Sequence, residues 1–249
     1  MNMTLDSPVA WAMALLGALC VGLSKTGFTG ISLISVLLFA DLFGAKDSVG
    51  LVLPLLIIAD LTVYPAFRRH GSWRPVFKLL FPTLLGLAIG YYVLGQIDDH
   101  QARRGIGLSV LLMVAVQSLR LTHPVQFDRL ADSRPFGIAA GFVGGLATMM
   151  ANAAGPVIQL FLLSRRIPKM ELIGISARFF LLINLLKVPL TAKLDLITPQ
   201  TLWINLLLAP GVLLGVLLGK RIVQHIPQRW FERLVIGFAL IAGSRLCFF

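Results

Sequence analysis

Charged residues are scarce in this chain: 13% of its 249 residues are Asp, Glu, Lys or Arg, whereas 57% are hydrophobic. Soluble domains carry about 25% charged residues, so the composition excludes an ordinary soluble protein and indicates lipid as the solvent. In lipid only helices and closed barrels satisfy every backbone polar group, and apolar runs such as residues 51–58 lack the alternation of barrel strands. We therefore expect an all-α integral membrane protein.

Cysteine and histidine are also rare, with two and four copies. Cys20 and Cys247 lie in apolar stretches without a CxxC pattern, and the histidines are scattered, so we expect no disulfide, no metal site and no cofactor. The net charge of +11 comes from basic residues in short loops rather than from one patch with aromatics, which argues against nucleic acid as a partner. Residues 1–7 hold no lysine or arginine, so the first apolar run is expected to be retained and not cleaved as a signal peptide.

Ten apolar segments follow one another along the chain: 8–23, 31–43, 48–66, 75–95, 105–119, 135–150, 155–163, 171–191, 200–219 and 230–248. Segments 31–43 and 155–163 are short, and each follows a break rich in glycine, asparagine or threonine. We predict two re-entrant or broken helical hairpins, 8–43 and 135–163, each followed by three transmembrane helices.

Lysine and arginine gather on one side of the membrane if both hairpins return to the side where they start. Arg68, Arg69, Arg165 and Arg166 then share the basic, cytoplasmic side, and both termini lie outside, in the periplasm of a bacterial inner membrane.

The two halves of the chain also match each other. Gly50, Leu61 and Pro65 match Gly174, Leu185 and Pro189 at an offset of 124, and Gly86-x-x-x-Gly90 matches Gly215-x-x-x-Gly219 at 129. We interpret residues 1–120 and 135–249 as inverted repeats joined by a cytoplasmic linker, 121–134, which is a frequent plan of transporters. Chance similarity between leucine-rich segments is the alternative.

The hairpin breaks carry the groups that recognise an anion. In Ser24-Lys25-Thr26-Gly27-Phe28-Thr29-Gly30, the glycines let the backbone turn, the threonines can cap the next helix, and Lys25 adds a cation to the positive helix N-terminus. The second break offers Asn152, Gly155 and, one turn further, Gln159. Inverted hairpins would bring both breaks together, although Lys25 could instead extend to the membrane surface from an ordinary short span.

Four further polar side chains fall inside apolar segments. Arg178 lies deep in 171–191, where a charge indicates function; the alternative is a structural ion pair with Asp60. Asp60 could itself carry a coupling proton. Asn184, which matches Asp60 in the repeat, could bind a ligand or form an interhelical contact. Lys187 is half a turn around the helix from Arg178, so we expect it to extend to the outer interface.

With the Gly22-Leu23-Ser24-Lys25-Thr26-Gly27-Phe28-Thr29-Gly30 break, four further segments and a second break at Asn152 to Pro156, the chain resembles the TauE/SafE family of sulfite exporters and related membrane permeases. It lacks the longer glycine run and following proline of many members. The resemblance implies outward transport of small sulfur-containing anions such as sulfite, sulfoacetate or other sulfonates. Such an anion would be held by Lys25, Arg178 and backbone amides after Gly27 and Gly155, and oriented by Thr26, Thr29 and Asn152.

Transport would be secondary, because the sequence has no ATP-binding motif. It would follow alternating access, with one half of the protein rocking against the other. The alternatives are a passive anion channel, an intramembrane enzyme acting on an anionic lipid-linked substrate, and a structural subunit of a larger complex. The expected partners are the anion and the bilayer, and a homodimer is compatible with the sequence.

Overall fold

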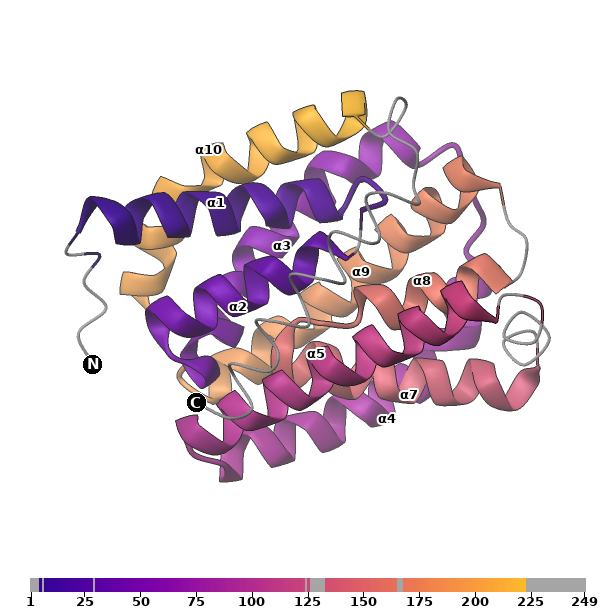
Figure 1. The fold of residues 1–249 in the computed structure, drawn as a ribbon, viewed down its shortest axis with the longest axis horizontal. Coiled ribbons are helices and arrows are strands. Elements are labelled where there is room, and N and C mark those ends of the chain that lie inside the picture. Colours follow the sequence, from indigo (N-terminus) through magenta and orange to yellow (C-terminus); the bar gives the residue numbers. More distant parts are fainter. Residues whose placement is uncertain are drawn as a thin grey trace.

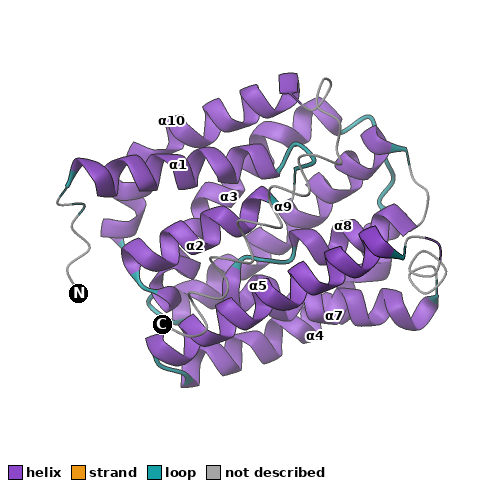
Figure 2. Cartoon of the chain, viewed as in Figure 1, coloured by secondary structure: helices purple, strands orange, loops and turns teal. Residues whose placement is uncertain are grey.

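The computed structural model describes residues 5, 7–28, 30–123, 125, 133–164 and 168–222. In this part of the chain every regular element is a helix (Figures 1 and 2), which confirms the all-α prediction. The helices are α1 (Pro8–Ser24), α2 (Ile31–Phe43), α3 (Ala45–Phe67), α4 (Arg74–Gln96), α5 (Asp99–Thr122), α7 (Arg134–Ala151), α8 (Gly155–Ser164), α9 (Lys169–Lys193) and α10 (Pro199–Ile222). The predicted segment 230–248 lies outside the described residues.

Within the described part of the chain, four helices are long and apolar enough to cross a membrane: α3, α4, α9 and α10. They match the predicted segments 48–66, 75–95, 171–191 and 200–219 within a few residues. The predicted crossing 105–119 is part of α5, which is not among these four. Asp98 and Gln101 form a capping box that starts α5 before the apolar run, so the polar residues of the first turns, including Arg103 and Arg104, belong to the helix.

Contacts between distant segments define the two ends of the helical bundle. At the first end, Gly50 contacts Leu196, Gly95 contacts Leu194, and the Lys46 ammonium donates to the Ile97 carbonyl at 3.0 Å. At the second end, the turn after α3 meets the start of α9, where Gly71 contacts Glu171 and Gly174 contacts the His70 carbonyl.

Each hairpin returns to the end of the bundle at which it starts: the first hairpin to the first end, and the second hairpin to the second end. The glycine contacts of α1 with α10 run in parallel register, so α1 starts at the first end, and α2 returns there to the start of α3. The contacts of α7 with α4 are parallel as well, so α7 starts at the second end, and α8 returns there toward the start of α9. Figure 1 shows the same courses, with α1 beside α10 and α7 beside α4.

Glycines allow these two helix pairs to approach closely, as is common where membrane helices pack. A Cβ on Gly22 would lie 2.1 Å from the Val212 carbonyl oxygen of α10, and one on Gly145 would lie 2.1 Å from the Thr83 carbonyl oxygen of α4. Because the obstacles are backbone atoms, no side-chain movement can relieve the overlap. The first helix of each hairpin is thus held against a long helix distant in sequence.

We predict that Gly22→Ala and Gly145→Ala each destabilise the protein by about 1–3 kcal/mol, since a methyl group forces the helices apart. Gly95→Ala is the matched control, because its Cβ would meet only the Leu194 Cδ2 atom, at 3.3 Å. Thermal unfolding in detergent should show lower midpoints for the first two variants and an unchanged midpoint for the third. Equal midpoints for all three would contradict the close packing.

Candidate functional site

A cavity lies between the hairpin breaks and the middle of α3 and α9. Counted together with the open space at its mouth, it encloses about 590 Å³ that no protein atom fills. Six of the predicted site residues line it: Lys25, Gly27, Asp60, Asn152, Gly155 and Asn184. Its α9 lining runs from Asn184 back to Leu172, about 18 Å toward the second end of the bundle.

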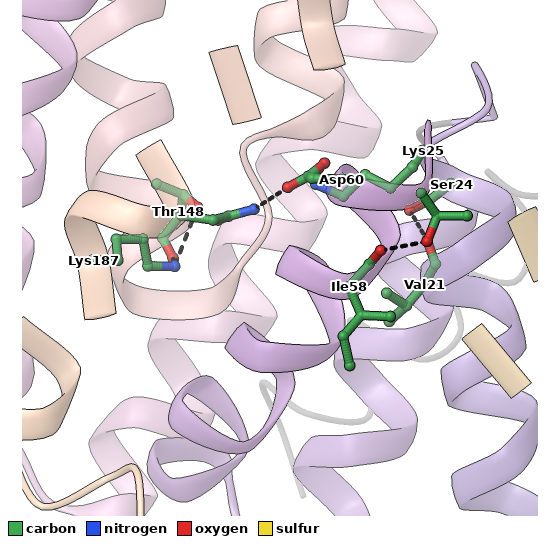
Figure 3. Close-up of polar contacts among 9 residues, drawn as sticks. Val21, Ser24, Lys25, Ile58, Asp60, Thr148 and Lys187 are labelled. Atoms are coloured by element: carbon green, nitrogen blue, oxygen red, sulfur yellow. Dashed lines mark hydrogen bonds and ion pairs between the residues drawn. The ribbon is translucent and has the colours of Figure 1, made fainter. Parts of the chain in front are cut away.

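Lys25, Asp60 and Asn184 are linked across this cavity by an ion pair and a hydrogen bond. The Lys25 ammonium lies 2.9 Å from Asp60 Oδ1, and the Asn184 amide Nδ2 donates to Asp60 Oδ2 at 2.7 Å. The ammonium also lies 4.5 Å from the centroid of the Phe180 ring, a cation–π contact that supports the charge from a third side. Asp60 therefore pairs with Lys25, and not with Arg178 as the structural alternative assumed (Figure 3).

Two buried oxygen atoms of these three residues accept no hydrogen bond in the described structure: Asp60 Oδ1, which forms the ion pair with Lys25, and Asn184 Oδ1. Asn184 Oδ1 is buried and has no hydrogen-bond partner in the described structure, although Asn184 lines the cavity. A buried carbonyl oxygen without a partner costs about 1–3 kcal/mol, so this atom favours a donor, such as water or a ligand hydroxyl, inside the cavity.

The second hairpin break is held by Lys187. Its side chain is fully buried, and its ammonium donates to the Thr148 carbonyl and to Asn152 Oδ1, each at 2.5 Å, and to the Thr148 hydroxyl at 3.3 Å (Figure 3). The expectation that Lys187 extends to the outer interface is thus wrong. The carbonyl groups at the C-terminal end of α7 attract a cation more strongly than the distant surface does.

Asn152 ends α7 in the left-handed conformation, with φ 54° and ψ 26°. While its Oδ1 accepts from Lys187, its Nδ2 donates to the Val49 carbonyl at 3.0 Å. The side chain is consequently fixed between α9 and α3, and Asn152 lines the cavity from a rigid position.

The two hairpins meet directly at the first break. Gly27, with φ 112°, adopts a conformation that favours glycine, and its carbonyl accepts a hydrogen bond from Gln159 Nε2 of α8 at 3.3 Å. Gln159 thus joins the breaks without lining the cavity. Gly155 lines the cavity as the first residue of α8, so the N-terminus of that helix borders the site.

Thr26 and Gly30 of the first break differ from the prediction. The Thr26 hydroxyl donates back to the Leu23 carbonyl at 2.8 Å, and its side chain packs on Gly219, so it closes α1 and does not cap α2. Gly30 is the N-cap of α2, which has no side-chain cap. Neither residue is part of the cavity lining. Thr29 lies outside the described residues.

Arg178 lies apart from the cavity, at the second end of the bundle. Its guanidinium donates to the carbonyls of His70 and Gly174, each at 2.8 Å, and to that of Arg68, and it stands over the rings of Tyr64 and Trp73. Arg178 does not lie beside Lys25 as expected, because the turn after α3 offers its guanidinium two carbonyl oxygens and α9 itself offers a third, that of Gly174. The geometry assigns Arg178 to fixing that turn against α9.

We predict that Arg178→Ala lowers the free energy of unfolding by about 2 kcal/mol, because hydrogen bonds from a charged donor contribute about 1.5–3 kcal/mol each and water replaces part of them. The substrate KM should stay within about twofold of the wild type, a change of less than 0.5 kcal/mol. Thermal unfolding and transport kinetics on the same preparation measure both. A tenfold rise in KM with unchanged stability would place Arg178 in the binding site after all.

Sequence reasoning missed several residues at the site, among them Ser24, Thr148, Ser176 and Phe180. Helical periodicity links those on α9: Ser176, Phe180 and Asn184 follow at intervals of four, and Lys187 three residues later, so they share a face. Arg178, two residues before Phe180, points away from it. That spacing was readable in the sequence, but not which face was turned inward.

These features together define a membrane transporter: a bundle of apolar helices whose central cavity is bordered by two broken hairpins and a buried ion pair. The family model for the sulfite exporters TauE/SafE matches residues 12–246, and the chain belongs to this family. This confirms the resemblance and agrees with the expectation of a transporter rather than an enzyme.

The chain is also similar to a probable bacterial transporter. It is 26% identical over 209 residues to the probable inner membrane transporter protein TsaS of Comamonas testosteroni, and the match covers 77% of this chain and 81% of that protein. No solved structure matches the chain.

Proposed function

We propose that the protein is a secondary transporter of small sulfur-containing anions, such as sulfite, sulfoacetate or other sulfonates, across the bacterial inner membrane. The observation that carries this proposal is the Lys25 ammonium, placed in a buried cavity at the meeting point of both hairpins. A cation held there, in a site of low dielectric constant, attracts an anion far more strongly than a surface lysine does. Family membership supports the substrate class.

The residues around Lys25 suit a small oxyanion. Ser24 and Ser176 line the cavity and carry hydroxyl groups, the Asn152 amide is fixed at its border, and the N-terminus of α8 adds a positive dipole end at Gly155. Asn184 Oδ1 accepts a hydrogen bond from a hydroxyl or from water that accompanies the anion. Lys25 would thus attract the charge of the anion, and the neutral hydroxyl and amide groups would select its shape.

Inverted repeats explain why equivalent contacts occur twice. Gly50 packs on the turn at Leu196 and Gly174 on the turn at His70, while Gly86 packs on α7 and Gly215 on α1. Asp60 and Asn184, which are 124 residues apart, touch each other, as matched positions must near a pseudo-twofold axis. These contacts support repeats at 1–120 and 135–249 joined by the linker 121–134. The predicted segment 230–248, which would complete the second repeat, lies outside the described residues.

Alternating access would follow from rocking of one repeat against the other. The α9 lining leads toward the second end, which carries the basic turn at Arg68 and Arg69 and which we assign to the cytoplasm. The described conformation would then be the one that faces inward. In this orientation both termini lie outside, and export, as the family description suggests, begins from the cavity seen here. The homodimer stays a prediction.

The orientation makes a labelling prediction. In a chain with Cys20 and Cys247 replaced by serine, we expect His100→Cys, at the exposed first end, to react with a membrane-impermeant maleimide in intact spheroplasts. Ser72→Cys, exposed at the second end, should react only after permeabilisation. Reaction of position 72 in intact spheroplasts would contradict the orientation.

Transport itself is tested with purified protein in vesicles. We expect saturable uptake of labelled sulfite or sulfoacetate and acceleration by unlabelled anion on the opposite side, which distinguishes a carrier from a channel. The variant Arg103→Met, which breaks the peripheral Arg103–Asp41 pair of 2.7 Å, is the control that should transport like the wild type. Absence of flux for every sulfur anion would overturn the proposal.

A further inference from the structure

The Lys25 ammonium, the cation of the site, already forms an ion pair with the Asp60 carboxylate. Asp60 Oδ1 lies 2.9 Å from the Lys25 ammonium, and the exposed fractions of the two side chains are 1% for Asp60 and 10% for Lys25. An incoming anion would have to share this ammonium with Asp60. In a buried site of low dielectric constant two negative groups on one ammonium repel each other strongly, so the pair as it stands opposes anion binding.

We propose that the anion and a proton bind together, with the proton on Asp60 Oδ1; this inference rests on the proposed transport function. When the carboxylate takes the proton, its ion pair with Lys25 breaks and an ammonium–anion pair forms in its place. Oδ2 keeps its hydrogen bond from Asn184, and the new O–H group can donate to the anion. Asp60 is therefore held in place in both states, and no other group has to move.

The surroundings of Asp60 single out this proton site. The charged side chains in contacts between α3 and its neighbours include Lys25, Asp41, Arg103, Arg178, Lys187 and Lys220, and, at the first end of the bundle, Lys46, Asp47 and Asp99. Lys25 is the partner that the structure gives to Asp60. Of the others, Asp41 is engaged with Arg103, Arg178 and Lys220 with carbonyls, and Lys187 with Thr148 and Asn152.

Charge balance agrees with joint binding. Lys187 has no carboxylate partner among the described residues, so Lys25, Asp60 and Lys187 together carry one net positive charge before an anion binds. A proton and a monovalent anion add no net charge. A proton and a divalent anion such as sulfoacetate add one negative charge, which the positive charge of the site balances. The two ligands consequently cross in the same direction. A proton antiporter would instead need a site from which each ligand excludes the other.

The experiment measures both fluxes in one vesicle preparation that holds a trapped pH dye. The probe is labelled sulfoacetate, which is fully ionised at neutral pH and carries no dissociable proton of its own into the vesicle. We expect uptake by the wild type to acidify the interior, with about one proton per anion, and to rise as the external pH falls. Asp60→Asn should move sulfoacetate without protons and with a flat pH profile, whereas Asp41→Asn should behave like the wild type.

The outcomes separate the two proposals. Sulfoacetate flux without proton movement in the wild type would overturn the inference and leave the transport function standing. Proton movement that persists in Asp60→Asn would overturn the inference in the same way. Absence of any sulfoacetate flux, together with absence of sulfite flux, would overturn the transport function and this inference with it.

Discussion

Replacing Lys25 with methionine is expected to reduce anion transport at least tenfold and to lower the free energy of unfolding by about 3 kcal/mol. The loss of stability arises because Asp60 would remain buried without its counter-charge, and breaking a buried ion pair by removing one partner costs about 3–5 kcal/mol. Asp60→Asn in the same chain should recover most of that stability, since an uncharged amide needs no ammonium and can still bond to Asn184. Transport should not recover, because the double variant has no cation for the substrate.

The peripheral pair Arg103–Asp41 provides the matched control for this experiment. Its side chains are 24% and 20% exposed, so Arg103→Met should cost about 1 kcal/mol or less and leave transport unchanged. Thermal unfolding in detergent and anion flux in vesicles would be measured on all four proteins. Full transport by the double variant Lys25→Met/Asp60→Asn would show that the substrate does not depend on the Lys25 charge.

Lys187→Met is expected to reduce transport about tenfold or more, with a smaller effect on stability than Lys25→Met. Methionine has nearly the same length but donates no hydrogen bond, so the Thr148 carbonyl and Asn152 Oδ1 lose their partner and Asn152 loses its fixed orientation. The free energy lost with these hydrogen bonds is partly offset, because the variant no longer buries a charge, whose desolvation costs several kcal/mol. The second hairpin break would therefore lose its shape before the bundle loses its fold.

Lys193→Met is the control on the same helix, because Lys193 is exposed at the end of α9. Its transport rate and unfolding midpoint should match the wild type. If Lys187→Met transports at the wild-type rate, the position of Asn152 is irrelevant to the substrate, and the second break is no part of the binding site.

Hydropathy predicted the long helices well because each is a continuous apolar run. The predicted segments 75–95 and 200–219 differ from α4 and α10 by at most three residues at either end. Hydropathy found the apolar part of α5 but missed the start of this helix, whose first turns are polar and begin at a capping box. Hydropathy could not predict that α1 packs on α10 and α4 on α7 either. This pairing of helices depends on which glycine-containing faces contact each other in the folded protein.

The site was predicted in part. The two breaks, Lys25, Asp60 and Asn184 were recognised as polar groups in apolar surroundings, and the structure brings them together around one cavity. Of the two basic residues on opposite faces of α9, Arg178 was expected at the site and Lys187 at the outer interface. In the structure Lys187 is buried at the second break, and Arg178 is buried against the turn after α3, apart from the cavity. Depth within a segment could not decide between the faces, because carbonyl groups of a distant turn and of the α7 end determine where each cation is satisfied.

The most direct test of the central claim, that an anion binds at Lys25 between the hairpin breaks, is to locate a bound selenium analogue of sulfite by anomalous scattering. Crystals grown with selenite should show a selenium peak in the cavity, about 3–4 Å from the Lys25 ammonium, as expected for an oxyanion that accepts its hydrogen bond. The peak should be absent from Lys25→Met crystals. An empty cavity in wild-type crystals, with selenium bound elsewhere on a protein that transports selenite, would contradict the account.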